Sequence, residues 1–169
     1  MSFQQFRQSL RVRDGLVKVA KGSDVSAGDE HFTPKWLFDA LGVVFDLDVS
    51  APLDLQTHVP SRNKYTVVDD GLIQPWFGNV WCNPPYSQPT PWVEKFIYHR
   101  CGIALLPMTR GKWWFKLWNE ADAIMPVAHN LKFELPDGKT KPITFNPVLF
   151  AFGASNVEAL HKSELFKVR

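Results

Sequence analysis

The chain has 169 residues, of which 45% are hydrophobic and 14% aromatic, and its formal net charge is +2. This length fits one domain with its own core and leaves little room for a separate recognition module. The composition excludes collagen-like and intrinsically disordered proteins, and so small a net charge carries no argument about partners by itself.

Chemically distinctive side chains are few and scattered. Cys82 and Cys101 lie in apolar, strand-like runs, which favours buried, reduced thiols over a disulfide framework. The 5 histidines lack the close spacing that marks zinc sites, so we predict no bound metal. No apolar run is suited to a signal peptide or a membrane span. We therefore expect a cytoplasmic protein without membrane association.

Residues 1–29 are expected to form a basic N-terminal arm and linker, followed by a single domain at residues 30–169. Before position 22 the sequence has one acidic residue, Asp14, and these basic residues: Arg7, Arg11, Arg13, Lys18 and Lys21. Two interpretations are open for the arm. It binds nucleic-acid phosphates by electrostatic attraction, or it is a solvated, partly disordered terminus.

Residues 33–42 have the pattern of a short helix, with Thr33 as N-cap, Pro34 in the first turn and Gly42 as the stop. Residues 43–49 are predicted to follow as a strand. Near its end lies Asp48, whose carboxylate is well placed to hold an amine or ribose hydroxyls. A surface strand terminus explains an acid there almost as well.

Residues 53–76 lose the periodic signal, and we predict a long irregular connection. Loops of this length inside a compact domain are usually functional. Arg62 and Lys64, beside Tyr65, are candidates for contacting a nucleic-acid backbone, with a solvated loop as the alternative.

The later segments alternate between strand and helix patterns. Strands are predicted at residues 80–82, 102–107 and 122–127, and helices at residues 90–100, 112–120 and 156–165. Residues 131–135 are expected to pair with residues 143–152 across a turn at 136–139. The order predicts an α/β fold with a mainly parallel sheet and an antiparallel hairpin at its late edge, near the C-terminus.

The strand at residues 80–82 must end at Asn83, because Pro84 and Pro85 cannot donate to a sheet ladder. The chain should then leave the sheet with Tyr86 at the tip. The side-chain carbonyl of Asn83 and the backbone carbonyl freed by Pro85 can accept the N–H groups of an exocyclic amine, and Tyr86 can stack on its ring. Such a clamp needs a strong electrophile, such as the sulfonium methyl group of S-adenosylmethionine, and neither a metal nor a covalent enzyme intermediate.

Asn83-Pro84-Pro85-Tyr86 resembles the catalytic motif of amino-group DNA methyltransferases, and the wider pattern is similar to the phage-type DNA adenine-N6 methyltransferase (Dam) family. The similar segments are, in order, Thr33-Pro34, residues 45–51, Asp70-Gly71-Leu72 with Trp76, the tetrapeptide, and residues 92–95, 131–133 and 150–153. The resemblance implies a compact, Rossmann-like methyltransferase fold that depends on S-adenosylmethionine. It also implies direct, in-line methyl transfer to the N6 amine of an adenine flipped out of the DNA double helix.

The resemblance further implies roles for individual residues. The catalytic set would be Asn83, Pro84, Pro85 and Tyr86, which hold the target base. The cofactor-binding set would be Thr33, Pro34, Asp48, Ser50, Ala51, Asp69 and Asp70. Within it, Asp48 would receive the methionine amino group, and Asp69 or Asp70 would lie near the adenosine. In place of the glycine-rich loop of the wider methyltransferase pattern stands Ser50-Ala51-Pro52-Leu53, which predicts weak cofactor affinity or a pocket that closes only on DNA.

The expected partner is double-stranded DNA, bound by a monomer or weak homodimer in the cytoplasm of a bacterium or a phage-infected host. Besides the basic arm, the candidate DNA-binding residues are Arg62, Lys64, Arg110, Lys112 and Lys116. So small a module makes few base contacts, so we expect relaxed sequence specificity or dependence on a dimer. Two alternatives stay open: a cytosine-N4 DNA methyltransferase, and a catalytically inactive DNA-binding or decoy protein.

Overall fold

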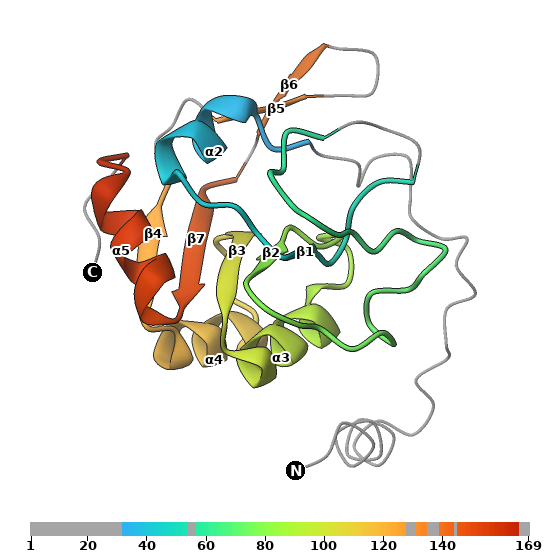
Figure 1. Ribbon diagram of the computed structural model, residues 1–169. Helices are drawn as coiled ribbons and strands as arrows, with labels where there is room; N and C mark the ends of the chain where they lie inside the picture. The colour runs from blue at the N-terminus through green and yellow to red at the C-terminus, as the bar shows by residue number, and fades with distance from the viewer. Residues whose placement is uncertain (1–31, 54–56, 128–130, 135–138, 144, 166–169) are drawn as a thin grey trace.

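The computed structural model describes residues 32–53, 57–127, 131–134, 139–143 and 145–165. The basic arm predicted at residues 1–29 and most of the predicted turn at 136–139 lie outside these ranges. The helices are α2 (Lys35–Leu41), α3 (Pro89–His99), α4 (Lys112–Glu120) and α5 (Ala154–Lys162). The strands are β1 (Leu47–Asp48), β2 (Val80–Cys82), β3 (Gly102–Pro107), β4 (Ala123–Pro126), β5 (Lys132–Glu134), β6 (Thr140–Pro142) and β7 (Pro147–Phe152). Figure 1 shows their arrangement.

Five strands form the main sheet, in the order β1-β2-β3-β7-β4. β1 and β3 pair with β2 in parallel, whereas β7 is antiparallel to both of its neighbours, β3 and β4. The α/β class is therefore confirmed, but the sheet is mixed instead of mainly parallel. β7 is buried at every position, so its apolar run is better accommodated inside the sheet than at an edge.

Alternating side chains of the sheet build two cores, one on each face. On one face, Trp81 and Leu105 pack beneath α2 and α5 with residues such as Leu37 and Leu160. On the other face, the core joins the sheet to α3 and α4. The molecule thus has three layers, with a helix pair on each side of the sheet.

A separate hairpin corrects the predicted strand pairing. β5 pairs with β6, not with residues 143–152, and the two form a two-stranded antiparallel sheet of their own. A backbone bridge between Phe32 and Glu134 ties this hairpin to the segment before α2, and Figure 1 shows it beyond the end of the main sheet. β5 does not pair with β7, because β7 is already paired on both sides by β3 and β4.

The first predicted strand is shorter than expected. Only Leu47 and Asp48 form β1, and the chain around them pairs on its outer side with the irregular connection, through parallel bridges Phe45 to Ser61 and Asp48 to Lys64. The long connection therefore covers the β1 edge of the sheet. Among the described residues, none of the helices has both the length and the apolar character needed to cross a membrane.

Candidate active site

The carboxyl ends of the parallel strands β1 and β2 bring Asp48 and Asn83 to the same edge of the sheet. Ser50 connects them. Its backbone N–H donates to Asp48 Oδ1 at 3.2 Å, and its hydroxyl donates to the main-chain oxygen of Asn83 at 3.0 Å. A residue expected to hold the cofactor and one expected to hold the base are therefore neighbours, at the edge where open α/β sheets bind ligands.

Two side chains orient the amide of Asn83. The Tyr86 hydroxyl donates to Asn83 Oδ1 at 2.7 Å, and Asn83 Nδ2 donates to Thr33 Oγ1 at 3.4 Å. Thr33 is only 3% exposed. It was expected to cap the following helix, but Pro34 occupies the N-cap position and no side-chain cap bond forms. The Thr33 hydroxyl faces the amide instead, because the chain starts its helix one residue later than predicted.

Tyr86 is turned into the protein and does not stand at the exposed tip that the sequence suggested. Its ring lies edge-on to Phe145, with centroids 5.4 Å apart, and packs near Phe133 of the hairpin. Its hydroxyl also donates to the main-chain oxygen of Leu105 at 3.3 Å. Burial raises the pKa of the phenol, so the hydroxyl stays a hydrogen-bond donor at neutral pH. The hairpin thus packs directly against the catalytic candidate.

Asp48 is a buried carboxyl group, with 3% of its surface exposed. Burial raises its pKa to about 7, and the opposing influences of the Ser50 N–H bond and the Lys64 charge are smaller. A carboxylate buried in this way gains from a cationic partner. The side chain is therefore suited to receive an ammonium group.

The remaining cofactor candidates flank this region. Pro34 is buried, and the buried Ala51 donates its N–H to the main-chain oxygen of Tyr65 at 2.8 Å. Asp69 and Asp70 lie in the connection, where both carboxylates stabilise local turns. The carboxylate of Asp69 accepts bonds from the N–H and hydroxyl of Thr66, and Asp70 accepts from a backbone N–H two residues on.

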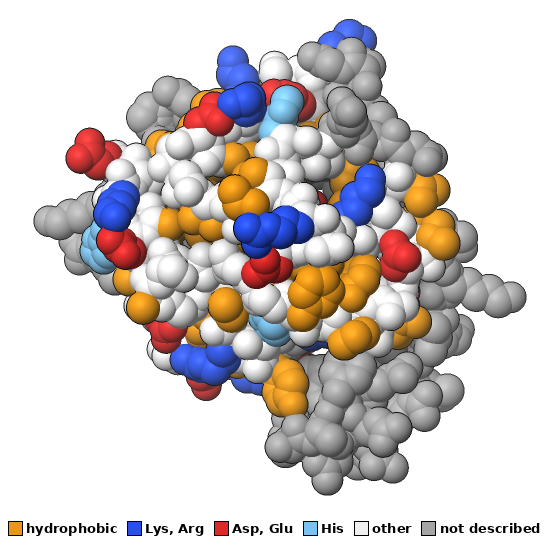
Figure 2. All heavy atoms as spheres, in the orientation of Figure 1, with side chains coloured by type: hydrophobic (Ala, Val, Ile, Leu, Met, Phe, Trp, Pro, Cys, Tyr) orange, Lys and Arg blue, Asp and Glu red, His pale blue; other side chains and the backbone are white. Residues whose placement is uncertain are grey.

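The predicted DNA-binding residues do not form one cluster. Arg62 is paired with Asp46 at 2.6 Å, and Lys116 lies 3.9 Å from Glu94. Lys64 is the bridge partner of Asp48, while Arg110 and Lys112 flank the start of α4, after the carboxyl end of β3. Figure 2 shows lysine and arginine side chains dispersed over the face in view, several of them beside acidic groups.

The sequence analysis gave no role to Lys95, a buried lysine on α3 that ends the family-like segment 92–95. It is 3% exposed, and its ammonium group donates to main-chain oxygens of the turn that follows Asp70. The signal available in the sequence was a lysine directly before Phe96, on the buried side of a predicted amphipathic helix.

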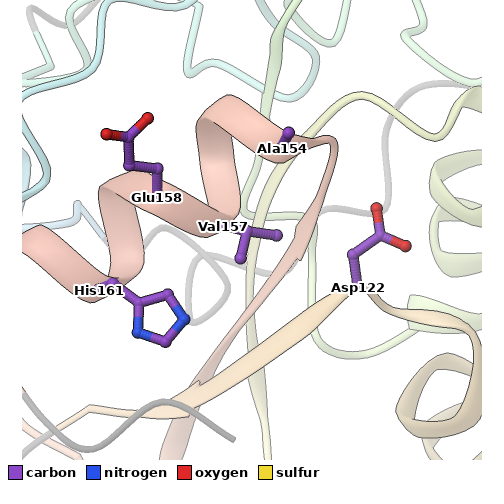
Figure 3. A pocket seen from close by; sticks show the side chains of 5 residues that line it. All are labelled: Asp122, Ala154, Val157, Glu158 and His161. Carbon is purple, nitrogen blue, oxygen red and sulfur yellow. The ribbon is translucent and has the colours of Figure 1, made fainter.

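A surface depression of about 500 Å³ lies elsewhere, between α5 and the start of β4 (Figure 3). It is lined by Asp122, Ala154, Val157, Glu158 and His161. Asp122 precedes β4, at the opposite end of the sheet from Asn83, and is paired with Arg100, while Glu158 is paired with Lys162. Its acidic groups are therefore already bonded, and it does not compete as a catalytic site. Within the described ranges, no group of three or more His, Cys, Asp or Glu side chains is placed to hold a metal ion.

The three-layer α/β fold places a buried acid and the strand-ending Asn-Pro-Pro-Tyr segment at the sheet edge where open α/β folds bind their ligands. The family model described as "DNA N-6-adenine-methyltransferase (Dam)" matches residues 22–148, and the chain belongs to this family. A curated relative, the DNA N-6-adenine-methyltransferase of Haemophilus phage HP1 (strain HP1c1), is 28% identical over 136 residues, which cover 68% of this chain and 77% of the relative. No solved structure matches the chain significantly.

Proposed function

We propose that the protein transfers a methyl group from S-adenosylmethionine to the N6 amine of adenine in DNA. The observation that carries the proposal is the oriented Asn83 amide beside the buried Asp48, in a chain of the DNA N-6-adenine-methyltransferase family. On this proposal the fold is a compact, Rossmann-like methyltransferase fold with β7 as the reversed strand.

Asn83 is proposed to hold the target amine. Its Oδ1 atom already accepts the Tyr86 hydroxyl, but a carbonyl oxygen has two lone pairs and can accept a second donor from the amine. The main-chain carbonyl of Pro84 is proposed to accept the other N–H. Two accepted hydrogen bonds draw the nitrogen lone pair out of conjugation with the ring and direct it toward an electrophile.

The residues present fit the cofactor. Asp48 offers a buried carboxylate for the methionine amino group, and Gly71 brings a main-chain turn into close contact with Val49 without a side chain between them. When bound, S-adenosylmethionine supplies an electrophilic sulfonium methyl group. Asp69 and Asp70 are proposed to lie toward the adenosine, although each carboxylate also stabilises its own turn.

An adenine stacked in duplex DNA cannot present its amine to Asn83, so the base must be flipped out of the helix. Tyr86 would stack on the flipped base only after its ring rotates away from Phe145. We propose double-stranded DNA as the partner. Its proposed contacts are Lys64, which bridges to Asp48, and Arg110 and Lys112, which follow the carboxyl end of β3.

Methyl transfer from labelled S-adenosylmethionine to duplex DNA tests the proposal directly. Wild-type protein should label the DNA, and Asn83→Ala should lose at least about 100-fold in kcat, because it removes the acceptor for the amine. Ser163→Ala is a control that should keep wild-type activity, because Ser163 is the C-cap of α5 and its hydroxyl bonds to the end of that helix. Retained activity in Asn83→Ala would rule out the assigned role, and absence of turnover in the wild type would favour the inactive, DNA-binding alternative.

A further inference from the structure

The buried ammonium group of Lys95 binds three main-chain oxygens of one turn. Its Nζ atom lies 2.9 Å from the oxygen of Gly71, 2.9 Å from that of Leu72 and 2.5 Å from that of Gln74. It also lies 5.1 Å from the ring centroid of Trp76. A buried cation is tolerated only when it is well hydrogen-bonded, and an ammonium has three N–H donors for these three carbonyls. The turn therefore provides a matched site for the lysine.

The same turn presses against the chain that follows Asp48. A Cβ atom on Gly71 would lie 2.0 Å from the main-chain oxygen of Val49 and 3.1 Å from the ring of Trp92, so only glycine allows this contact. The indole N–H of Trp76 also donates to the oxygen of Gly71 at 2.7 Å. A displacement of the turn therefore changes the surroundings of Val49 and, through it, of Asp48.

Lys95 links this turn to the other half of the site. It belongs to α3, which begins at Pro89, shortly after Tyr86. One side chain thus connects the helix that follows the Asn-Pro-Pro-Tyr segment to the turn beside the carboxyl end of β1. Two segments that are distant in the sequence meet at this ammonium group: Asp70-Gly71-Leu72 and residues 92–95. Both belong to the family resemblance, and neither was assigned to the catalytic set.

We propose that Lys95 is a positioning residue that holds the turn at residues 70–74 against Val49 and so shapes the cofactor side of the active site. The inference rests on the proposed function, because it assigns the Asp48 side to S-adenosylmethionine. The described contacts of Lys95 are with this turn and with Trp76, so it acts on the site through the turn. Its loss is therefore expected to weaken cofactor binding and to leave the chemical step largely intact.

The test is a comparison of Lys95→Met with wild-type protein in methyl transfer to DNA, with S-adenosylmethionine as the varied substrate. Methionine keeps the apolar stem and removes the ammonium group. We expect the KM for S-adenosylmethionine to rise about tenfold or more while kcat stays within about threefold. Lys162→Met, an exposed lysine on α5, is the matched control and should leave both constants unchanged.

A KM for S-adenosylmethionine within twofold of the wild-type value would overturn the inference. This holds even if kcat falls, because a purely structural role of Lys95 would lower the fraction of active protein without changing KM. Failure of the proposed function gives a different result, because the wild-type protein itself would then show no turnover. That result would contradict both the proposed function and the role of Lys95. If Lys95→Met does not fold, hydrogen exchange on wild-type protein decides. S-adenosylmethionine should slow amide exchange at residues 71–74, and unchanged exchange there would overturn the inference.

Discussion

Asn83 and Asp48 carry the proposed chemistry, and each depends on neighbours that are distant in sequence. Thr33 and Tyr86 fix the two ends of the Asn83 amide, and Ser50 bonds to both Asp48 and the backbone of Asn83. The amide oxygen is thereby held in one orientation before any substrate arrives. This arrangement is the preorganisation on which electrostatic catalysis depends.

Asp48→Asn should make the protein more stable at pH 8 and abolish its binding of S-adenosylmethionine. The pKa of Asp48 is about 7 in the folded state against 3.8 ordinarily, so the folded state binds an extra proton between these values. Wild-type stability therefore falls as pH rises from about 4 to about 7, by up to roughly 4 kcal/mol. Asparagine is neutral at every pH, so the stability of Asp48→Asn should not fall over this pH range. Urea unfolding at pH 5 and pH 8, with calorimetric titration of the cofactor, measures both effects.

The exposed Asp39→Asn serves as the control and should change stability by less than about 0.5 kcal/mol at either pH. Equal stability of wild type and Asp48→Asn at pH 8 would show that burial of the Asp48 carboxylate does not destabilise the folded protein. Undiminished cofactor binding by Asp48→Asn would remove its assigned role as the partner of the amino group.

The sequence identified Asn83 and Asp48 as strand-end residues because a proline pair and an acid after an apolar run are local signals. It did not identify the partners of Asn83. Thr33 was read as a helix cap, which is also a local pattern, and its contact with Asn83 exists only because α2 packs over the end of β2. The role of Lys95 was not predicted for the same reason, since its carbonyl partners lie more than twenty positions away along the chain.

At the scale of elements, Trp81 shows how β2 connects the helical layer that contains α2 to the candidate site. It lies on β2, two positions before Asn83, and is 1% exposed. Its ring meets Phe38 of α2 with centroids 4.9 Å apart and Phe45 with centroids 5.5 Å apart. The position of α2, and with it the position of Thr33, therefore depends on this indole.

Trp81→Ala is expected to lower the free energy of unfolding by about 3–5 kcal/mol, because it leaves a large cavity that the sheet cannot close. Trp118→Ala is the matched comparison. Trp118 is 46% exposed on α4, and its loss should cost less than about 1 kcal/mol. Thermal or urea unfolding measures both. Equal destabilisation by the two substitutions would contradict the core assigned here.

Most elements were predictable from the sequence because their signals are local. The strand at residues 102–107 and the helix at residues 112–120 have the predicted limits, and α3 differs by one residue at each end. The partners of strands were not predictable. β7 was assigned to a hairpin because it follows β5 after a turn, whereas its burial on both faces places it between β3 and β4.

At the scale of the whole molecule, the sheet edge carries every part of the proposed reaction. Asp48 and Ser50 are the proposed cofactor side and Asn83 to Tyr86 the proposed base side, while the β5-β6 hairpin packs on Tyr86 through Phe133. Arg110 and Lys112 follow the neighbouring strand end at the same edge. On the proposed function, this one edge of the sheet holds both substrates of the methyl transfer next to each other.

The most direct test of the central claim is mass-spectrometric nucleoside analysis of duplex DNA incubated with the protein and S-adenosylmethionine. The account predicts N6-methyladenine in the wild-type product and its loss with Asn83→Ala. N4-methylcytosine in place of N6-methyladenine would show that the amine clamp serves the other base. Recovery of DNA without any methylated base would contradict the proposed activity.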